Sequence, residues 1–176
     1  MEQIRRYAEG KDLDMTVLVA YASKHGATEG IATFVAERLR SLGMDAEARK
    51  AEEVESLDVV DAVVLGSAVY AGSWMKEAME FVHRHAEALA PLPVWLFSSG
   101  PLGEEIQDGM DQIRQLPELR ATLSPRDHQI FFGALDTEAL GFGERMIAKA
   151  VKAPDGDFRD WDAIGVWTEG IAAELG

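Results

Sequence analysis

Cysteine is absent from the 176-residue chain. This absence excludes disulfides, thiolate zinc sites, iron–sulfur clusters held by cysteine and a cysteine nucleophile, so redox chemistry would need a bound cofactor. Long apolar runs are also missing, and residues 1–14 lack the apolar segment of a signal peptide. We therefore expect a cytoplasmic protein without integral membrane association.

Basic residues are scarce relative to acidic ones, with 17 Lys and Arg against 31 Asp and Glu, for a net charge of −14. A field of this sign repels phosphate backbones and anionic lipid surfaces, so we expect no nucleic-acid partner. The same field could steer the protein toward positively charged partners. It could equally serve solubility alone.

The length fits one domain at 15–176, preceded by a polar extension at 1–14 that has no periodicity. Strands that are apolar on both faces are predicted at 16–21, 62–67, 93–98 and 129–135. Such strands belong to a parallel sheet that is covered by helices on each face. A fifth stretch, 46–51, alternates small apolar with charged residues, which is typical of an edge strand.

Helices are predicted between these strands. In 27–42 the apolar residues Ile31, Val35, Leu39 and Leu42 recur at helical spacing, and Gly43 marks the end. Further helices are predicted at 74–89 and 161–175, and the long connection 99–128 should hold a helix near 104–116 or serve a function. The alternation of strands and helices predicts an α/β doubly wound fold.

Three predicted strands end in loops rich in Gly and hydroxyl side chains. The first loop reads SKHGAT at 23–28, the second GSAVYAGSW at 66–74 and the third SSGPLG at 98–103. In a doubly wound sheet, ligands bind beyond the carboxyl ends of the strands, and a helix N-terminus favours phosphate. Each loop alone could be an ordinary turn, but three together favour a ligand site.

Other phosphate-binding and phosphoacceptor sites are excluded by the same loops. No GxGxxG or GxxxxGK[ST] pattern follows the first strand, which argues against dinucleotide and P-loop sites. A receiver domain would need an acidic pair after the first strand and an Asp ending the third, and neither is present. His83 and His85 lie two residues apart on a predicted helix and point in different directions, so we expect surface histidines and no metal site.

The stretches VLVAYASKHGATEGIA, VVLGSAVYAGSWMKEA and FRDWDAIGVWTEGIA resemble the flavodoxin-like family, in particular the branch that includes menaquinone-dependent protoporphyrinogen oxidase. The resemblance covers most of 15–176. It implies a doubly wound five-stranded parallel sheet in the order 2-1-3-4-5, and flavin mononucleotide (FMN) as the cofactor.

The resemblance also implies a cofactor-binding set, with no catalytic residue and no metal ligand assigned. The phosphate would be held by Ser23, Lys24, His25, Gly26, Ala27 and Thr28. One face of the flavin ring would be lined by Ser67, Ala68, Val69, Tyr70, Ala71 and Gly72, with Tyr70 against the ring and Trp74 as the alternative. The other side would be lined by Ser98, Ser99, Gly100, Pro101 and Leu102.

The implied function is that of an FMN-binding flavoprotein: an oxidoreductase or an electron-transfer protein whose substrate is unassigned. One alternative is an enzyme similar to the menaquinone-dependent protoporphyrinogen oxidases, which would use a quinone. An electron carrier would instead dock on a redox protein partner. A further alternative is a non-redox domain that has lost the cofactor.

Overall fold

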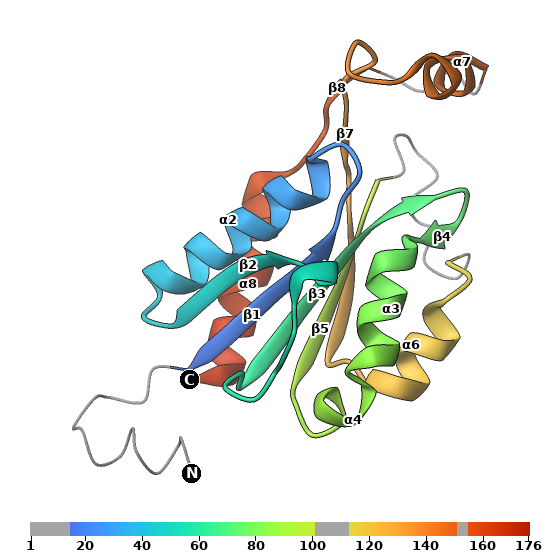
Figure 1. The fold of residues 1–176 in the computed structure, drawn as a ribbon. Coiled ribbons are helices and arrows are strands. Elements are labelled where there is room, and N and C mark those ends of the chain that lie inside the picture. Colours follow the sequence, from blue (N-terminus) through green and yellow to red (C-terminus); the bar gives the residue numbers. More distant parts are fainter. Residues whose placement is uncertain (1–14, 101–112, 151–154) are drawn as a thin grey trace.

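The computed structural model describes residues 15–100, 113–150 and 155–176. A parallel sheet in the order β2-β1-β3-β5-β6 forms its centre, and β4 pairs antiparallel with β3 (Figure 1). The strands are β1 (Thr16–Ala22), β2 (Asp45–Lys50), β3 (Ala62–Tyr70), β4 (Ser73–Trp74), β5 (Val94–Ser99) and β6 (Asp127–Phe131). The order 2-1-3-4-5 predicted for the parallel strands is confirmed, since β4 only folds back on β3.

Helices cover both faces of the sheet (Figure 1). One face carries α2 (Ala27–Ser41) and α8 (Trp161–Leu175). The other carries α3 (Lys76–Arg84), α4 (Ala86–Leu89) and α6 (Leu116–Leu123), and the short 3-10 helix η1 (Ala51–Glu53) follows β2. The chain therefore has the predicted doubly wound α/β fold.

Alternate residues of each central strand supply two separate cores. In β1, Val17 and Val19 pack into the core beneath α2 and α8, whereas Leu18 and Ala20 pack into the core beneath α3 and α6. A period of two residues sends neighbouring side chains to opposite faces, and both faces here are covered. In the edge strand β2, Ala46 is buried, Ala48 and Arg49 are partly buried and the other three residues are exposed, in line with its mixed composition.

The first crossover helix, α2, follows the predicted apolar stripe through Ile31, Val35 and Leu39, all of which are fully buried. Leu42 was predicted to continue this buried stripe, and that prediction is wrong. The helix ends at Ser41, and the Leu42 side chain is 42% exposed. Gly43 takes a φ of 91°, which suits glycine, and its N–H donates to the Arg40 carbonyl.

The helix predicted at 74–89 is in fact a strand and two helices. Trp74 belongs to β4 because the chain turns back after Tyr70 and pairs Val69 with Trp74. His85 separates α3 from α4, with a non-helical ψ of 15°. Its ring is buried 3.1 Å from the Val54 carbonyl, so the expectation of a surface histidine is wrong here, whereas His83 is exposed.

The strand predicted at 129–135 is also interrupted. β6 ends at Phe131, and Ala134–Leu135 forms β7 in a second, two-stranded sheet with β8 (Gly156–Asp157). Gly133 passes close to Gly100. A Cβ added to Gly133 would lie 3.2 Å from the Gly100 Cα. Between β7 and β8 stands α7 (Phe142–Ala150), which projects beyond the carboxyl ends of the parallel strands (Figure 1). We call residues 134–157 the insert.

The last helix, α8, has the predicted bounds of 161–175. Asp160 begins it by accepting a hydrogen bond from the Ala163 N–H, and Ile164, Thr168 and Ile171 are buried against the sheet. Most of the helix predicted near 104–116 lies outside the described residues. Within the described part of that connection, residue 116 begins α6.

Candidate functional site

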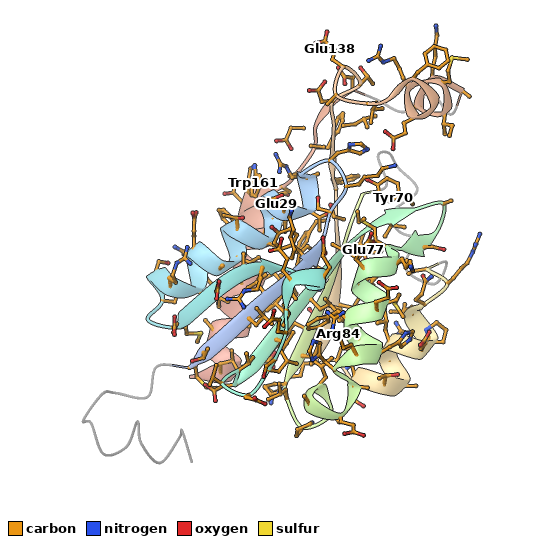
Figure 2. All side chains as sticks on the ribbon, viewed as in Figure 1. Glu29, Tyr70, Glu77, Arg84, Glu138 and Trp161 are labelled. Atoms are coloured by element: carbon orange, nitrogen blue, oxygen red, sulfur yellow. The ribbon has the colours of Figure 1, made fainter. Side chains whose placement is uncertain are left out.

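The register of the sheet brings the three predicted loops together. Ala22 of β1 pairs with Ser67 of β3, and Ser67 pairs with Ser98 of β5. The loops that follow these strands therefore leave the sheet side by side at one edge. Figure 2 shows Tyr70 and Glu29, from the second loop and the start of α2, at this same end.

The first loop runs over 23–28 into the N-terminus of α2. Gly26 precedes the helix with a φ of 88°, and its N–H donates to Ser23 Oγ at 3.1 Å. No side chain caps the helix, so the N–H groups of its first turn are left for another partner. The helix dipole adds partial positive charge at the same place, which suits an anion.

Thr28 lies in this first turn and is almost fully buried, with 1% exposure. Its Oγ1 has no hydrogen-bond partner. A buried hydroxyl without a partner is costly, and such groups in native proteins usually mark a missing water, ion or ligand. Thr28 and the uncapped helix start therefore fit a phosphate group.

The second loop, at 66–74, contains a hairpin in which two residues, Ala71 and Gly72, connect β3 to β4. Ala71 and Gly72 both have positive φ, 48° and 73°, as a tight turn of the primed type requires. The Gly72 carbonyl accepts from the Arg114 N–H, which ties the turn to the segment before α6. Tyr70 stands at the rim with 45% exposure, and the Lys24 Nζ lies 5.9 Å from its ring centroid.

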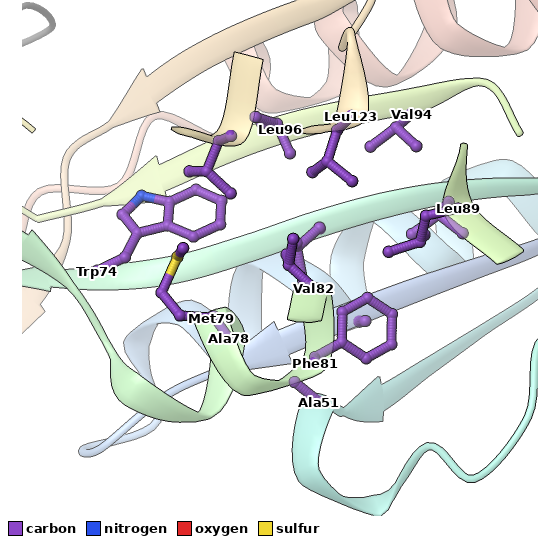
Figure 3. Packing of buried hydrophobic residues seen from close by; sticks show 14 of the residues in the cluster. Ala51, Trp74, Ala78, Met79, Phe81, Val82, Leu89, Val94, Leu96 and Leu123 are labelled. Atoms are coloured by element: carbon purple, nitrogen blue, oxygen red, sulfur yellow. The ribbon is translucent and has the colours of Figure 1, made fainter. Parts of the chain in front are cut away.

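Trp74, the alternative ring partner, is a core residue. It is 3% exposed and packs beside Met79 (Figure 3). Its indole Nε1 donates to Ser98 Oγ at 2.7 Å. The β3–β4 hairpin folds the indole inward, so Trp74 is buried rather than exposed at the loop.

The third loop begins with side chains that already have protein partners. Ser98 Oγ lies 2.8 Å from His128 Nε2 as well as accepting from Trp74. Ser67 of the second loop similarly accepts from the Met75 N–H and donates to the Ala68 carbonyl. Burial lowers the pKa of His128 to about 4, so its ring is neutral at physiological pH. These hydroxyls position the loops.

The remaining predicted residues have different surroundings. Ser99 is buried, and Gly100 follows it with a φ of 88° and open space where a Cβ would stand. Ala68 is buried, Val69 is partly buried, and Ala27 is partly exposed at the start of α2. Pro101 and Leu102 lie outside the described residues.

Glu144 of α7 meets the first loop, although it is 120 residues away from it along the chain. Its Oε1 forms an ion pair with Lys24, and its Oε2 lies 3.4 Å from His25 Nε2. The hydrogen bond from Lys24 holds the pKa of the Glu144 carboxyl below its usual range. Sequence reasoning missed Glu144, since its position in a mixed helix gives no signal of this contact.

Arg159 is a second residue that sequence reasoning missed. Its guanidinium pairs with Asp157 and also donates to the Ala27 carbonyl at 3.3 Å. The side chain lies against Gly30, where a Cβ would overlap it, and stacks over Trp161. Arg159 thus fastens the end of the insert to the start of α2. Its place inside FRDW, a stretch already singled out, was the available clue.

Within residues 15–100, 113–150 and 155–176, no group of three or more His, Asp or Glu side chains could hold a metal ion. None of the helices found there is long and apolar enough to cross a membrane.

The fold and the edge where its loops meet define a doubly wound α/β protein of the flavodoxin type. A family model described as a flavodoxin domain matches residues 18–162, and the chain therefore belongs to the flavodoxin domain family. The predicted family is confirmed.

One curated relative is the protoporphyrinogen IX dehydrogenase (quinone) of Escherichia coli strain K12. It is 22% identical over 172 residues, and the match covers 90% of this chain and 95% of that protein. Its length is therefore matched almost throughout, at low identity.

Solved structures agree on the fold. Flavodoxin 2 from Bacillus cereus has a TM-score of 0.60 at 24% identity, covering 92% of this chain and 99% of that one. The Streptococcus pneumoniae TIGR4 flavodoxin has a TM-score of 0.58 at 20% identity, covering 90% and 99%. Rubredoxin oxygen:oxidoreductase from Desulfovibrio gigas has a TM-score of 0.63 at 15% identity, covering 99% of this chain but only 39% of that longer one.

Proposed function

We propose that the protein binds FMN at the edge formed by the three loops and acts as a flavin-dependent oxidoreductase or electron-transfer protein. The observation that carries the proposal is Thr28, whose buried hydroxyl has no protein partner at an uncapped helix start. A phosphate would satisfy both the hydroxyl and the free N–H groups. When bound, the flavin ring would supply the electron transfer that this cysteine-free chain cannot provide by itself.

Each residue of the site has a distinct role under this proposal. Ser23 and Gly26 shape the first loop, Thr28 and the neighbouring N–H groups hold the phosphate, and Lys24 supplies a positive charge. Tyr70 is the exposed aromatic that can lie against the ring. Ser67, Ser98 and Trp74 hold the loops in place from below.

Titration of the purified apoprotein with FMN tests the proposal, read by quenching of flavin fluorescence. We expect stoichiometric binding, and about tenfold weaker binding for Thr28→Val, which removes one hydrogen bond to a charged oxygen and keeps the shape. Thr168→Val is the matched control, because that hydroxyl is buried on α8 and bonds the Ile164 carbonyl. Absence of binding would favour a domain that has lost the cofactor.

A second candidate function is quinone-coupled oxidation of protoporphyrinogen. It is supported by the match to the Escherichia coli enzyme of that name, which extends over 95% of its length. The net charge of −14 is less favourable for work at an anionic bilayer, where basic residues strengthen attachment. Turnover of protoporphyrinogen with a menaquinone analogue would support the enzyme. Rapid reduction by a flavodoxin reductase without such turnover would support a carrier.

A further inference from the structure

The helix α7 of the insert meets the first loop through Glu144. Glu144 bonds Lys24 and lies close to His25, and among the described residues these are the polar side-chain contacts that join α7 to the sheet domain. Arg145, the next residue, bonds the carbonyls of Thr137, Glu138 and Leu140, all of which lie within the insert. The attachment of α7 to the first loop therefore depends on Glu144.

The ion pair lies between two of the loops that would enclose the cofactor. Lys24 belongs to the first loop, and its Nζ stands over the ring of Tyr70 in the second. The hydrogen bond with Glu144 raises the pKa of Lys24, and the same bond lowers the pKa of the Glu144 carboxyl. A fixed negative charge therefore sits beside the place proposed for the phosphate.

A phosphate dianion and the Glu144 carboxylate would compete for the same positive charge. Within the first loop the cationic side chains are Lys24 and His25, and the guanidinium of Arg159 at the start of α2 is already paired with Asp157. Two anions held close together repel strongly where solvent screening is incomplete. The carboxylate is the anion that can move, because its side chain is partly exposed and it is on a helix that has few other ties to the body.

We propose that Glu144 is an internal counter-ion that competes with the FMN phosphate for Lys24 and His25, so that cofactor binding releases α7 from the first loop. This inference rests on the proposed binding of FMN. The released helix would carry an apolar face with it, because Phe142, Met146 and Ile147 are 83%, 57% and 66% exposed. The presence or absence of bound FMN would then determine the position of this apolar face of α7.

Affinity is the first test. Glu144→Gln removes the competing charge while keeping the shape, and we expect it to bind FMN about tenfold more tightly than the wild type at low ionic strength, with the gain shrinking as salt is added. Glu138→Gln is the matched control. It removes the same unit of charge from the insert at an exposed residue that does not touch the first loop (Figure 2).

Mobility of α7 is the second test, and it does not depend on activity. Because the chain has no cysteine, Lys149→Cys gives a single attachment point for a nitroxide label on α7. We expect the label to become more mobile when FMN is added to the otherwise unchanged protein. In the Glu144→Gln background the label should already be mobile without FMN.

The outcomes separate the two proposals. If neither the wild type nor Glu144→Gln binds FMN, the proposed function fails and the proposed competition fails with it. If both bind FMN with equal affinity, or Glu144→Gln binds more weakly, the proposed function stands and the competition is rejected. Unchanged label mobility on addition of FMN would likewise reject the release of α7.

Discussion

The indole Nε1 of Trp74 donates a 2.7 Å hydrogen bond to the Oγ of Ser98, which joins the second loop to the end of β5. Ser98 in turn lies 2.8 Å from His128 Nε2 on β6. A continuous polar connection thus runs beneath the candidate site, across two neighbouring strands of the sheet.

Replacing Trp74 with phenylalanine should lower stability and leave FMN affinity nearly unchanged. The variant keeps an aromatic ring in the core but loses the hydrogen bond to Ser98, which costs about 1 kcal/mol in the free energy of unfolding. Urea denaturation measures this loss. A large fall in FMN affinity without a change in stability would instead place Trp74 at the ring.

Replacing Tyr70 with alanine should have the opposite pattern. Its side chain is 45% exposed, so little core packing is lost, whereas stacking of about 0.5–1.5 kcal/mol on the flavin would disappear. We expect FMN to bind several-fold more weakly and its reduction potential to shift. Tyr70→Phe, which keeps the ring, is the control and should retain most of the affinity; equal losses in both variants would contradict stacking.

His128 should make stability depend on pH between about 4 and 6.5. Its pKa is lowered to about 4 in the folded protein, first by burial, whereas an unfolded histidine titrates near 6.5. The unfolded state therefore binds more protons in this window, and stability falls as pH falls through it, by roughly 3 kcal/mol in all. His128→Gln should flatten this dependence in denaturation measured at several pH values, and an unchanged dependence in this variant would contradict the prediction.

Gly66 in the middle of β3 should not tolerate alanine. A Cβ there would overlap the ring of Phe97, which is fully buried on the neighbouring strand β5. Overpacking of this kind costs about 1–3 kcal/mol. The double variant Gly66→Ala with Phe97→Leu should recover part of the loss in a denaturation experiment, and a purely additive result would contradict the clash.

The elements predicted well from the sequence are those with a strong period. Ile31, Val35 and Leu39 gave α2, and Ile164 and Ile171 gave α8, because one buried face leaves a helical spacing in the sequence. The errors arise where distant contacts decide. The sequence pattern predicts Trp74 in a helix, whereas in the structure the hairpin turn at Ala71 and Gly72 pairs Trp74 with β3.

The candidate site divides in the same way. The loops at 23–28 and 66–74 were recognisable from Gly and hydroxyl residues after buried strands, and the register of β1, β3 and β5 places them together. The contact of Glu144 with Lys24 could not be predicted, because it depends on how the insert folds back over the sheet edge. The assignment of FMN to the loop residues stays a prediction until titration.

The antiparallel pairing of Ala134 with Asp157 means that the chain leaves the sheet domain and returns to it at adjacent points. A segment whose two ends lie side by side can change in length or sequence with little strain on its host, since loop closure depends only weakly on loop length. The segment between β7 and β8 can therefore be replaced by another segment while the central sheet keeps its structure. Transplanting it between related proteins would give the same framework different neighbours without rebuilding a single strand of the central sheet.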